Sequence, residues 1–326
     1  MTALSFRAED WPLAEPFRFA GFTVTALEVI HVTLSQDGHR GQGEGVVPIV
    51  FDVTMAEEMT RLKGVAAALA AGQPAALACA ALPPGPARNA LDCALWDLRA
   101  KTGGRTIWDL AGLPPGPAAL EVDQTIGLGT PDEMADAART STHRVLKIKA
   151  DADLITDRLR AIRLARPEAE LIVDANQSWT PDLLALHAPV LADLGVAMIE
   201  QPLPVGEDAA LRRIASPVPI YADESCHTRA DLPGLIGAYQ GINIKLDKAG
   251  GLTEALALAR TARAGGMGVM VGCMAGTSLS MAPAFVIGTL SNWSDLDGPL
   301  LLAGDRPAPM TYAAGALSRF TPALWG

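Results

Sequence analysis

The chain has 326 residues and a formal net charge of −10, with 49% hydrophobic and 19% charged residues. This length exceeds the size at which one hydrophobic core usually stops growing, so a large domain beside a smaller one is expected. The acidic balance argues against a nucleic-acid partner, because binding phosphates requires a basic surface. No apolar run reaches the roughly 18–20 residues of a membrane span, and Arg7, Glu9 and Asp10 interrupt any signal-peptide core, so we expect a cytoplasmic protein without membrane contact.

Residues 1–115 have the pattern of a small α+β domain. The stretch 27–34 is rich in β-branched residues, which predicts a strand of an antiparallel sheet near the start of the chain. Between Pro86 and Lys101 the apolar residues recur at i, i+3 and i+4, which predicts a helix that ends at Gly103.

The second part of the chain has a repeating pattern. From about residue 118, short apolar runs alternate with amphipathic stretches rich in Ala and Leu, such as 253–264. This alternation predicts βα units whose parallel strands are buried on both faces. We therefore predict an α/β fold, a modified TIM (β/α) barrel over 116–301 with an α+β capping domain over 1–115. The tail, 302–326, is a candidate to pack on the cap.

Five polar residues lie at the ends of five successive apolar runs: Lys149, Asp174, Glu200, Asp223 and Lys245. By subtraction they are 25, 26, 23 and 22 residues apart, close to one strand and one helix per step. The strand ends of a barrel meet at one face, so the five side chains are expected to converge. Three carboxylates brought together repel one another, and Mg²⁺ resolves this conflict because it prefers a few carboxylates plus substrate and water oxygens. The alternative for any single acid is a helix cap or a salt-bridge partner.

The lysines suggest proton transfer. Lys147 and Lys149 are two residues apart on one predicted strand, so both face the barrel interior. Burial, a second ammonium and a dication all disfavour charge, so we expect the pKa of Lys149 to fall toward the working pH, as a general base requires. Lys245 ends the sixth predicted strand, across the ring from the second, so one amine could remove a proton while the other delivers one. Lys248 is interpreted as a solvated surface charge.

Several motifs together resemble the enolase superfamily, in its muconate-lactonizing-enzyme subgroup. Those of the barrel are LKIKA (146–150), VDANQSW (173–179), IEQPLP (199–204), ADES (222–225) and NIKLDKAGGLTEAL (243–256), and those of the cap are ARNALDCALWDL (87–98) and a GEG turn (43–45). The resemblance implies that Asp174, Glu200 and Asp223 bind Mg²⁺. It also implies that Lys149 and Lys245 are the catalytic acid and base, with Lys147 in support.

Within that subgroup the chain is most similar to the dipeptide epimerases of the L-Ala-D/L-Glu type. Their mark is an Asp-x-Asp motif at the eighth strand, present as Asp295 and Asp297, which in the family binds the α-ammonium of the dipeptide. The alternative is a pair of solvated loop acids. The stretch GCMAGTS (272–278) also resembles the family's seventh-strand loop, which makes Cys273 and Met274 candidates for the wall of the substrate pocket.

The first capping loop departs from the family pattern. Members that act on Ala-Glu carry an Arg there, but residues 19–25 contain none, which makes Phe19 and Phe22 candidate apolar contacts or simply packing residues. The loop at 46–51 is apolar too. A hydrophobic second residue of the dipeptide is therefore an alternative to Glu.

The resemblance implies a 1,1-proton transfer at the α-carbon of the C-terminal residue of a dipeptide, through an enediolate. A lyase or cycloisomerase of the o-succinylbenzoate synthase or muconate cycloisomerase type would use the same metal and lysines, and a barrel without activity is a third reading. The expected partner is a small-molecule dipeptide, and homo-oligomerisation is left open.

Overall fold

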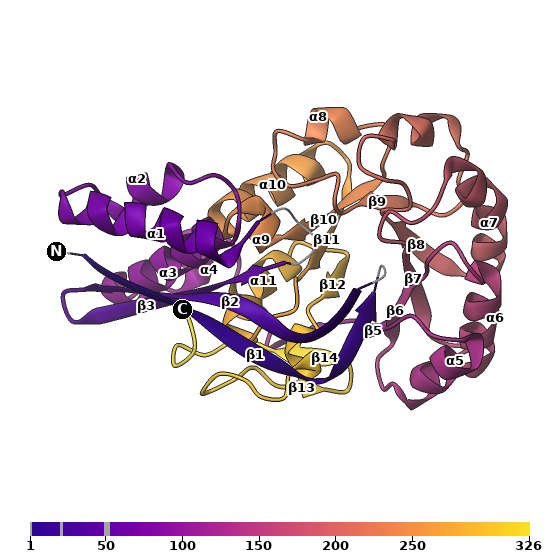
Figure 1. Ribbon diagram of the computed structural model, residues 1–326, viewed down its shortest axis with the longest axis horizontal. Helices are drawn as coiled ribbons and strands as arrows, with labels where there is room; N and C mark the ends of the chain where they lie inside the picture. Colours follow the sequence, from indigo (N-terminus) through magenta and orange to yellow (C-terminus); the bar gives the residue numbers. More distant parts are fainter. Residues whose placement is uncertain (1, 20–21, 49–52) are drawn as a thin grey trace.

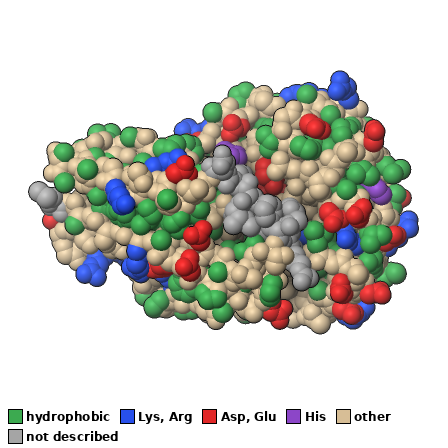
Figure 2. Space-filling view, in the orientation of Figure 1, with side chains coloured by type: hydrophobic (Ala, Val, Ile, Leu, Met, Phe, Trp, Pro, Cys, Tyr) green, Lys and Arg blue, Asp and Glu red, His purple; other side chains and the backbone are tan. Residues whose placement is uncertain are grey.

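The computed structural model describes residues 2–19, 22–48 and 53–326, with the side chains of Arg18, Phe19 and Phe22 outside the description. A capping domain of one sheet and several helices lies beside a ring of strands surrounded by helices (Figure 1). On the face in Figure 2, the Lys and Arg side chains of the described residues are scattered among acidic ones and form no stripe. Among the same residues, every helix is too short or too polar to cross a membrane.

The cap begins with a three-stranded antiparallel sheet and continues with helices, as predicted. Apolar residues of the predicted helix, such as Ala90, Leu91 and Ala94, are fully buried. The helix α3 ends where Gly104 adopts a left-handed conformation (φ 57°), which a glycine tolerates without strain. The elements are β1 (Ala3–Phe19), β2 (Phe22–Gln36), β3 (His39–Val47), α1 (Met55–Ala70), α2 (Ala75–Ala80), α3 (Pro86–Gly103) and α4 (Ile107–Ala111).

The GEG segment, predicted to be a turn, is instead part of strand β3. Its glycines face α3, and a Cβ atom on Gly43 would lie only 2.1 Å from the carbonyl oxygen of Ala90. The glycines therefore let a strand backbone lie directly against a helix backbone. Glu44, between two of these glycines, faces the other way and is buried.

The second domain is a parallel barrel, so the predicted fold class is confirmed. Its eight strands are hydrogen-bonded in chain order, and the Asp123 N–H donates to Ser294 O at 3.0 Å across the seam between the first and the last. The strands are β5 (Gln124–Ile126), β6 (Val145–Lys149), β7 (Glu170–Asp174), β8 (Val196–Glu200), β9 (Ile220–Ala222), β10 (Gly241–Lys245), β11 (Gly268–Gly272) and β12 (Trp293–Asp295).

Helices follow most of the strands and form the outer layer (Figure 1). The amphipathic stretch 253–264 lies in one of them, whose apolar residues, such as Leu258 and Ala259, are fully buried. The helices are α5 (Pro131–Thr140), α6 (Ile155–Ala165), α7 (Pro181–Asp193), α8 (Leu232–Leu235), α9 (Leu246–Ala249), α10 (Leu252–Ala264) and α11 (Ser278–Gly288), with 3₁₀ turns η1 (Asp208–Arg213) and η2 (Gly298–Leu301).

A floor of apolar side chains closes the barrel interior below the strand ends. Tyr221 and Trp293 meet there edge to face, with ring centroids 5.4 Å apart. The Tyr221 ring lies over Gly241 and Gly268, and a Cβ atom on Gly268 would be 1.8 Å from the Tyr221 hydroxyl oxygen. The remaining floor residues are Val145, Ile172, Met198 and Met270. Lys149, Asp174 and Glu200, the last residues of β6, β7 and β8, lie beyond this floor at the carboxyl ends of the strands.

The C-terminal tail contacts both domains. Its strands β13 (Tyr312–Ala313) and β14 (Ala316–Ser318) form a small sheet with β4 (Ala119–Glu121). Near the end of the chain, the Trp325 indole N–H donates to Cys93 O of α3 at 3.0 Å. Arg306 forms ion pairs with Glu9 of β1 and Glu44 of β3, each at 2.6 Å. The tail therefore fastens the cap to the barrel.

Candidate active site

A cavity of about 410 Å³ lies between the cap and the carboxyl ends of the barrel strands. The barrel supplies its charged groups, among them Lys147, Lys149, Asp223 and Lys245. The cap supplies an apolar wall, which includes Leu13, Phe17, Val24, Ala26, Leu27, Val46 and Val47. The cavity thus has a polar base and an apolar side.

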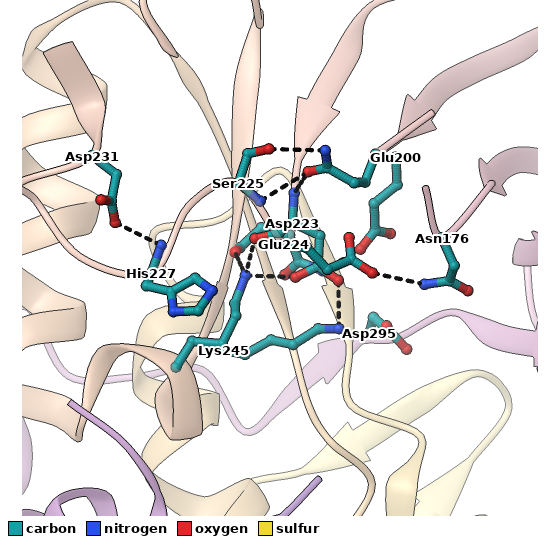
Figure 3. Close-up of polar contacts among 12 residues, drawn as sticks. Asn176, Glu200, Asp223, Glu224, Ser225, His227, Asp231, Lys245 and Asp295 are labelled. Carbon is teal, nitrogen blue, oxygen red and sulfur yellow. Dashed lines mark hydrogen bonds and ion pairs between the residues drawn. The ribbon is translucent and has the colours of Figure 1, made fainter. Parts of the chain in front are cut away.

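Of the five strand-end residues, Lys149, Asp223 and Lys245 line the cavity, and Asp174 and Glu200 are buried beside its lysines. Lys149, Asp174, Glu200 and Lys245 are the last residues of β6, β7, β8 and β10, and Asp223 directly follows β9. Lys149 pairs in register with Asp174, and Asp174 with Glu200, so their side chains lie in one layer. Glu200, Asp223 and Lys245 converge in Figure 3. The structure therefore brings together residues that are up to 96 positions apart by subtraction.

Lysine ammonium groups lie between the three acids. Lys147 Nζ is 3.0 Å from Asp174 Oδ2 and 2.9 Å from Glu200 Oε2. Lys149 Nζ donates to Asp174 Oδ2 at 2.7 Å, and Lys245 Nζ donates to Asp223 Oδ2 at 2.6 Å. Because these amines separate them, the oxygens of the three acids do not all lie within 4.8 Å of one another among the described residues. The ammonium group of Lys147 therefore occupies the space between Asp174 and Glu200.

The charges of the three acids are unequally compensated. Burial alone would raise the pKa of Asp174, but Lys147 and Lys149 hold it well below its usual range. Lys245 and Lys248 do the same for Asp223. Burial and the nearby Asp174 raise the pKa of Glu200 to about 8, and Lys147 offsets this only in part. Among the three acids, Glu200 is therefore the one whose ionisation would gain most from additional positive charge in the site.

Each acid also presents two different oxygens. One oxygen accepts a hydrogen bond from a donor of the surrounding structure, and the other contacts a lysine of the cavity. The structural donors are the Asn176 N–H to Asp174 Oδ1 (3.0 Å), Asn243 Nδ2 to Glu200 Oε1 (2.7 Å) and Lys248 Nζ to Asp223 Oδ1 (2.5 Å). Three pre-oriented carboxylate oxygens that already face a cation fit a divalent ion such as Mg²⁺.

Lys248 is not a solvated surface charge, contrary to the prediction. It is only 3% exposed, and its ammonium donates to the backbone and side-chain oxygens of Asp223 and to Asn243 O. Lys248 lies three residues after Lys245, on the single turn of α9 that follows β10, and this turn carries its side chain back beneath the strand ends. Helical spacing from Lys245 was the available signal, but the sequence alone does not reveal a four-residue helix.

Asp295 and Asp297 are both 5% exposed, so they are not solvated loop acids. Asp295 Oδ2 accepts from Lys147 Nζ at 2.6 Å, and Asp297 Oδ2 accepts from the Thr125 N–H at 2.8 Å. Burial and the neighbouring Asp295 raise the pKa of Asp297 to about 6. Cys273 lies within 4.8 Å of this pair. The two acids add buried negative charge to the lining of the cavity.

The predicted wall residues have different outcomes. Cys273 and Met274 line the cavity. The side chains of Phe19 and Phe22 lie outside the described residues, as do positions 49–52 of the second capping loop.

Sequence reasoning missed a contact that ties the sixth strand to the cap. Asp247 is fully enclosed, and its Oδ1 accepts from the Val46 N–H at 2.9 Å and from Asn89 Nδ2 at 2.7 Å. Asp247 is two residues from Lys245, and Val46 lines the cavity, so this contact fixes the cap wall relative to the cavity amines. An acid between apolar residues carries no sequence signal of such a partner.

Comparison with known proteins places this chain in a family. Residues 1–112 match the mandelate racemase / muconate lactonizing enzyme N-terminal domain, and residues 130–313 match the enolase C-terminal domain-like family. The chain therefore belongs to the enolase superfamily, as its motifs indicated.

Several individual members of this superfamily are similar to the chain over most of its length. A protein named L-Ala-D/L-Glu epimerase from Escherichia coli is 45% identical over 312 residues, 95% of this chain and 97% of that protein. One named N-acetyl-D-glutamate racemase from a Pseudoalteromonas species is 46% identical over 246 residues, 75% of this chain and 78% of that protein. A dipeptide epimerase from Enterococcus faecalis, solved with Mg and L-Leu-L-Tyr, has a TM-score of 0.89 at 26% identity, covering 97% of this chain and 96% of that one.

Replacing Asp247 with Asn should make stability less dependent on pH. Burial raises the Asp247 pKa to about 7, against the hydrogen bonds from Asn89 and Val46. The folded state then binds more protons than the unfolded chain between roughly pH 4 and 7, so the contribution of Asp247 to the free energy of unfolding falls as the pH rises through that window. Asn retains the accepting Oδ1 and does not titrate.

We therefore expect Asp247→Asn to gain roughly 2–4 kcal/mol relative to the wild type between about pH 4 and pH 8, measured by urea unfolding with EDTA present. A difference between the two proteins that stays constant across this range would contradict the assignment.

Proposed function

We propose that this protein is a magnesium-dependent dipeptide epimerase. It moves the α-proton of the C-terminal residue of a dipeptide from one face of the carbon to the other. The observation that carries this proposal is the placement of two cavity amines, Lys149 and Lys245, on the second and sixth of eight strands around three buried acids. Membership of the enolase superfamily and the relatives named as epimerases and racemases support it.

Asp174, Glu200 and Asp223 are the proposed holders of the metal. When bound, magnesium supplies positive charge that stabilises the negative charge developing on the substrate carboxylate and weakens the hold of the acids on the lysine protons. The need for added charge is visible in Glu200, whose pKa lies at about 8 among its buried neighbours. Lys147 is proposed to support the site as a buried cation beside these acids.

The two cavity lysines are proposed to act from opposite sides of the substrate. Lys149 lies on β6 and Lys245 on β10, half-way round the ring. Burial lowers the pKa of Lys245, but its ion pair with Asp223 outweighs this and raises the pKa well above its usual value. Lys245 therefore arrives protonated and can act as the acid, while the other amine acts as the base. The roles exchange for the opposite epimer.

Asp295 and Asp297 are proposed to bind the α-ammonium group of the dipeptide. A zwitterionic dipeptide has a carboxylate at one end and an ammonium at the other: the metal would bind the carboxylate, and the two buried acids, which line the cavity, would bind the ammonium. An ion pair of this kind combines charge with hydrogen bonding and orients the substrate along the cavity.

Deuterium exchange tests the proposed chemistry. Incubation of L-Ala-L-Glu and L-Ala-L-Leu with the enzyme and Mg²⁺ in D₂O should place deuterium on the α-carbon of the C-terminal residue and generate the L,D epimer. The measurement is ¹H NMR over time, with an EDTA-treated sample as the control that shows no exchange. A wider panel of L,L-dipeptides without exchange in any member would contradict the proposal.

The Pseudoalteromonas relative, by its name, favours N-acetyl-glutamate racemisation as a second candidate function. The same metal site and lysines could move the α-proton of such a substrate. The two activities differ at the amine end, because an acetylated amine carries no positive charge for Asp295 and Asp297 to bind.

Asp297→Asn separates these two activities. The variant removes one negative charge that holds an ammonium, so kcat/KM for a free-amine dipeptide should fall by about 100-fold. For N-acetyl-glutamate, we expect a change of less than about 3-fold, because the lost charge has no cationic partner there. Equal losses on both substrates would show that Asp297 acts only on the fold.

The side chain of the second residue is proposed to face the cap. Phe17 and Val24, which pair across β1 and β2, form part of the apolar wall together with Leu13. Among the described residues of this wall the only charged one is Glu28, so none of them would pair with a substrate carboxylate. This wall favours an apolar second residue, whereas the name of the Escherichia coli relative specifies Glu.

Val24→Arg should move the preference toward Glu. A guanidinium in the wall can pair with a substrate carboxylate, so the ratio of kcat/KM for L-Ala-L-Glu to that for L-Ala-L-Leu should rise at least about 10-fold. Val24→Met, of similar size to the arginine stem but uncharged, is the control and should leave the ratio within about 3-fold. An unchanged kcat/KM ratio in Val24→Arg would show that the side chain of the second substrate residue does not lie near Val24.

A further inference from the structure

Two buried residues, Asn243 of β10 and Lys248 of α9, donate hydrogen bonds to the proposed metal-binding acids Glu200 and Asp223. Among the described residues, Lys248 donates to three protein oxygens: the backbone and Oδ1 oxygens of Asp223, and Asn243 O at 3.1 Å. Asn243 is fully buried and donates through Nδ2 to Glu200 Oε1 at 2.7 Å. Because Lys248 also donates to Asn243, the two residues form one continuous brace behind the acids of β8 and β9.

The brace does not belong to the cavity surface. Neither Lys248 nor Asn243 is among the described residues that line the cavity, and both are almost fully buried, at 3% and 0% exposure. Lys245 differs from them in lining the cavity and contacting the opposite oxygen of Asp223. The amines on the two Asp223 oxygens therefore have different surroundings: one faces the substrate space and one does not.

A hydrogen bond to one carboxylate oxygen restricts the rotation of the whole carboxylate about its last bond. Lys248 holds both the backbone oxygen and Oδ1 of Asp223, and Asn243 holds Oε1 of Glu200. The other oxygens, Asp223 Oδ2 and Glu200 Oε2, contact Lys245 and Lys147, two lysines that line the cavity. When hydrogen-bond partners already fix the orientation of a metal ligand, the ion does not have to order that ligand on binding, so it binds more tightly.

We infer that Lys248 and Asn243 are positioning residues that fix Asp223 Oδ2 and Glu200 Oε2 in the orientation that receives the divalent ion. This inference rests on the proposed metal role of the two acids. Burying an ammonium costs several kcal/mol unless its charge is compensated, so the placement of Lys248 beside Asp223 indicates a specific electrostatic role.

Calorimetric titration of Mg²⁺ tests the brace without relying on activity. Lys248→Met keeps the length of the side chain and removes the charge, and it should weaken Mg²⁺ binding by about 10–100-fold. Asn243→Leu, which removes only the donor to Glu200, should weaken it by about 3–30-fold. With saturating Mg²⁺, the KM for the dipeptide should stay within about 3-fold of the wild-type value, because neither side chain reaches the cavity.

Lys101→Met is the matched control. Lys101 pairs with the buried Asp97 at 2.7 Å in the cap, away from the strand ends, so its loss removes a lysine from another buried acid in a different place. This variant should bind Mg²⁺ as the wild type does, even where its melting temperature falls. Circular dichroism verifies that each variant is folded, and Asn243→Leu carries the test if Lys248→Met does not fold.

The outcomes separate the two proposals. If the wild type itself does not bind Mg²⁺, the proposed metal site fails. If the wild type binds and both brace variants bind equally well, the metal site stands and the brace is overturned. If the Lys101 control weakens binding as much as the brace variants, the effect is one of general stability, and the positioning role is likewise overturned.

Discussion

Buried negative charge that the protein does not neutralise by itself is the constraint on which the active site depends. Six acids lie at or near the carboxyl ends of the barrel strands with four lysines among them: Asp174, Glu200, Asp223, Glu224, Asp295 and Asp297 against Lys147, Lys149, Lys245 and Lys248. Burial, together with the neighbouring charges of Asp174 and Asp295, raises the pKa of Glu200 to about 8 and that of Asp297 to about 6. A divalent ion at one end and an ammonium group at the other would supply what is lacking.

The rest of the fold maintains this imbalance. The apolar floor around Tyr221 prevents the charged layer from relaxing into the barrel, and the cap limits its access to water from above. Asp247 and Arg306 connect the two domains through buried polar contacts, so the apolar wall keeps a set position over the amines. The floor and the cap both keep water away from the buried acids, so the interactions between these charges are only weakly screened.

The strand-end residues were predictable from sequence because an apolar run that stops at a polar residue marks a buried strand and its carboxyl end. Their spacing then indicated a barrel, and the barrel indicated convergence. The burial of Lys248 is not predictable in this way, because it depends on a single helical turn after β10. Asn243 lies inside an apolar run, where the sequence does not distinguish a packed amide from a functional one. The GEG segment was misread because glycines serve close backbone packing as well as turns.

Other predictions need other measurements. The domain boundaries at 115 and 301, homo-oligomerisation, the lack of a nucleic-acid partner and the cytoplasmic location stay predictions from the sequence. The wall and the relatives point to different side chains on the second residue of the dipeptide. The described residues of the cap wall favour an apolar side chain, whereas the name of a relative at 45% identity specifies Glu.

The central claim is that two amines act on opposite faces of one carbon, and stereospecific exchange in single-lysine variants tests it directly. Lys149→Ala and Lys245→Ala are each incubated with Mg²⁺ in D₂O, separately with the L,L and the L,D epimer of one dipeptide. The account predicts that each variant exchanges the α-proton of only one epimer, and that the two variants retain opposite epimers. Loss of exchange from the same epimer in both variants would place the lysines on one face and contradict it.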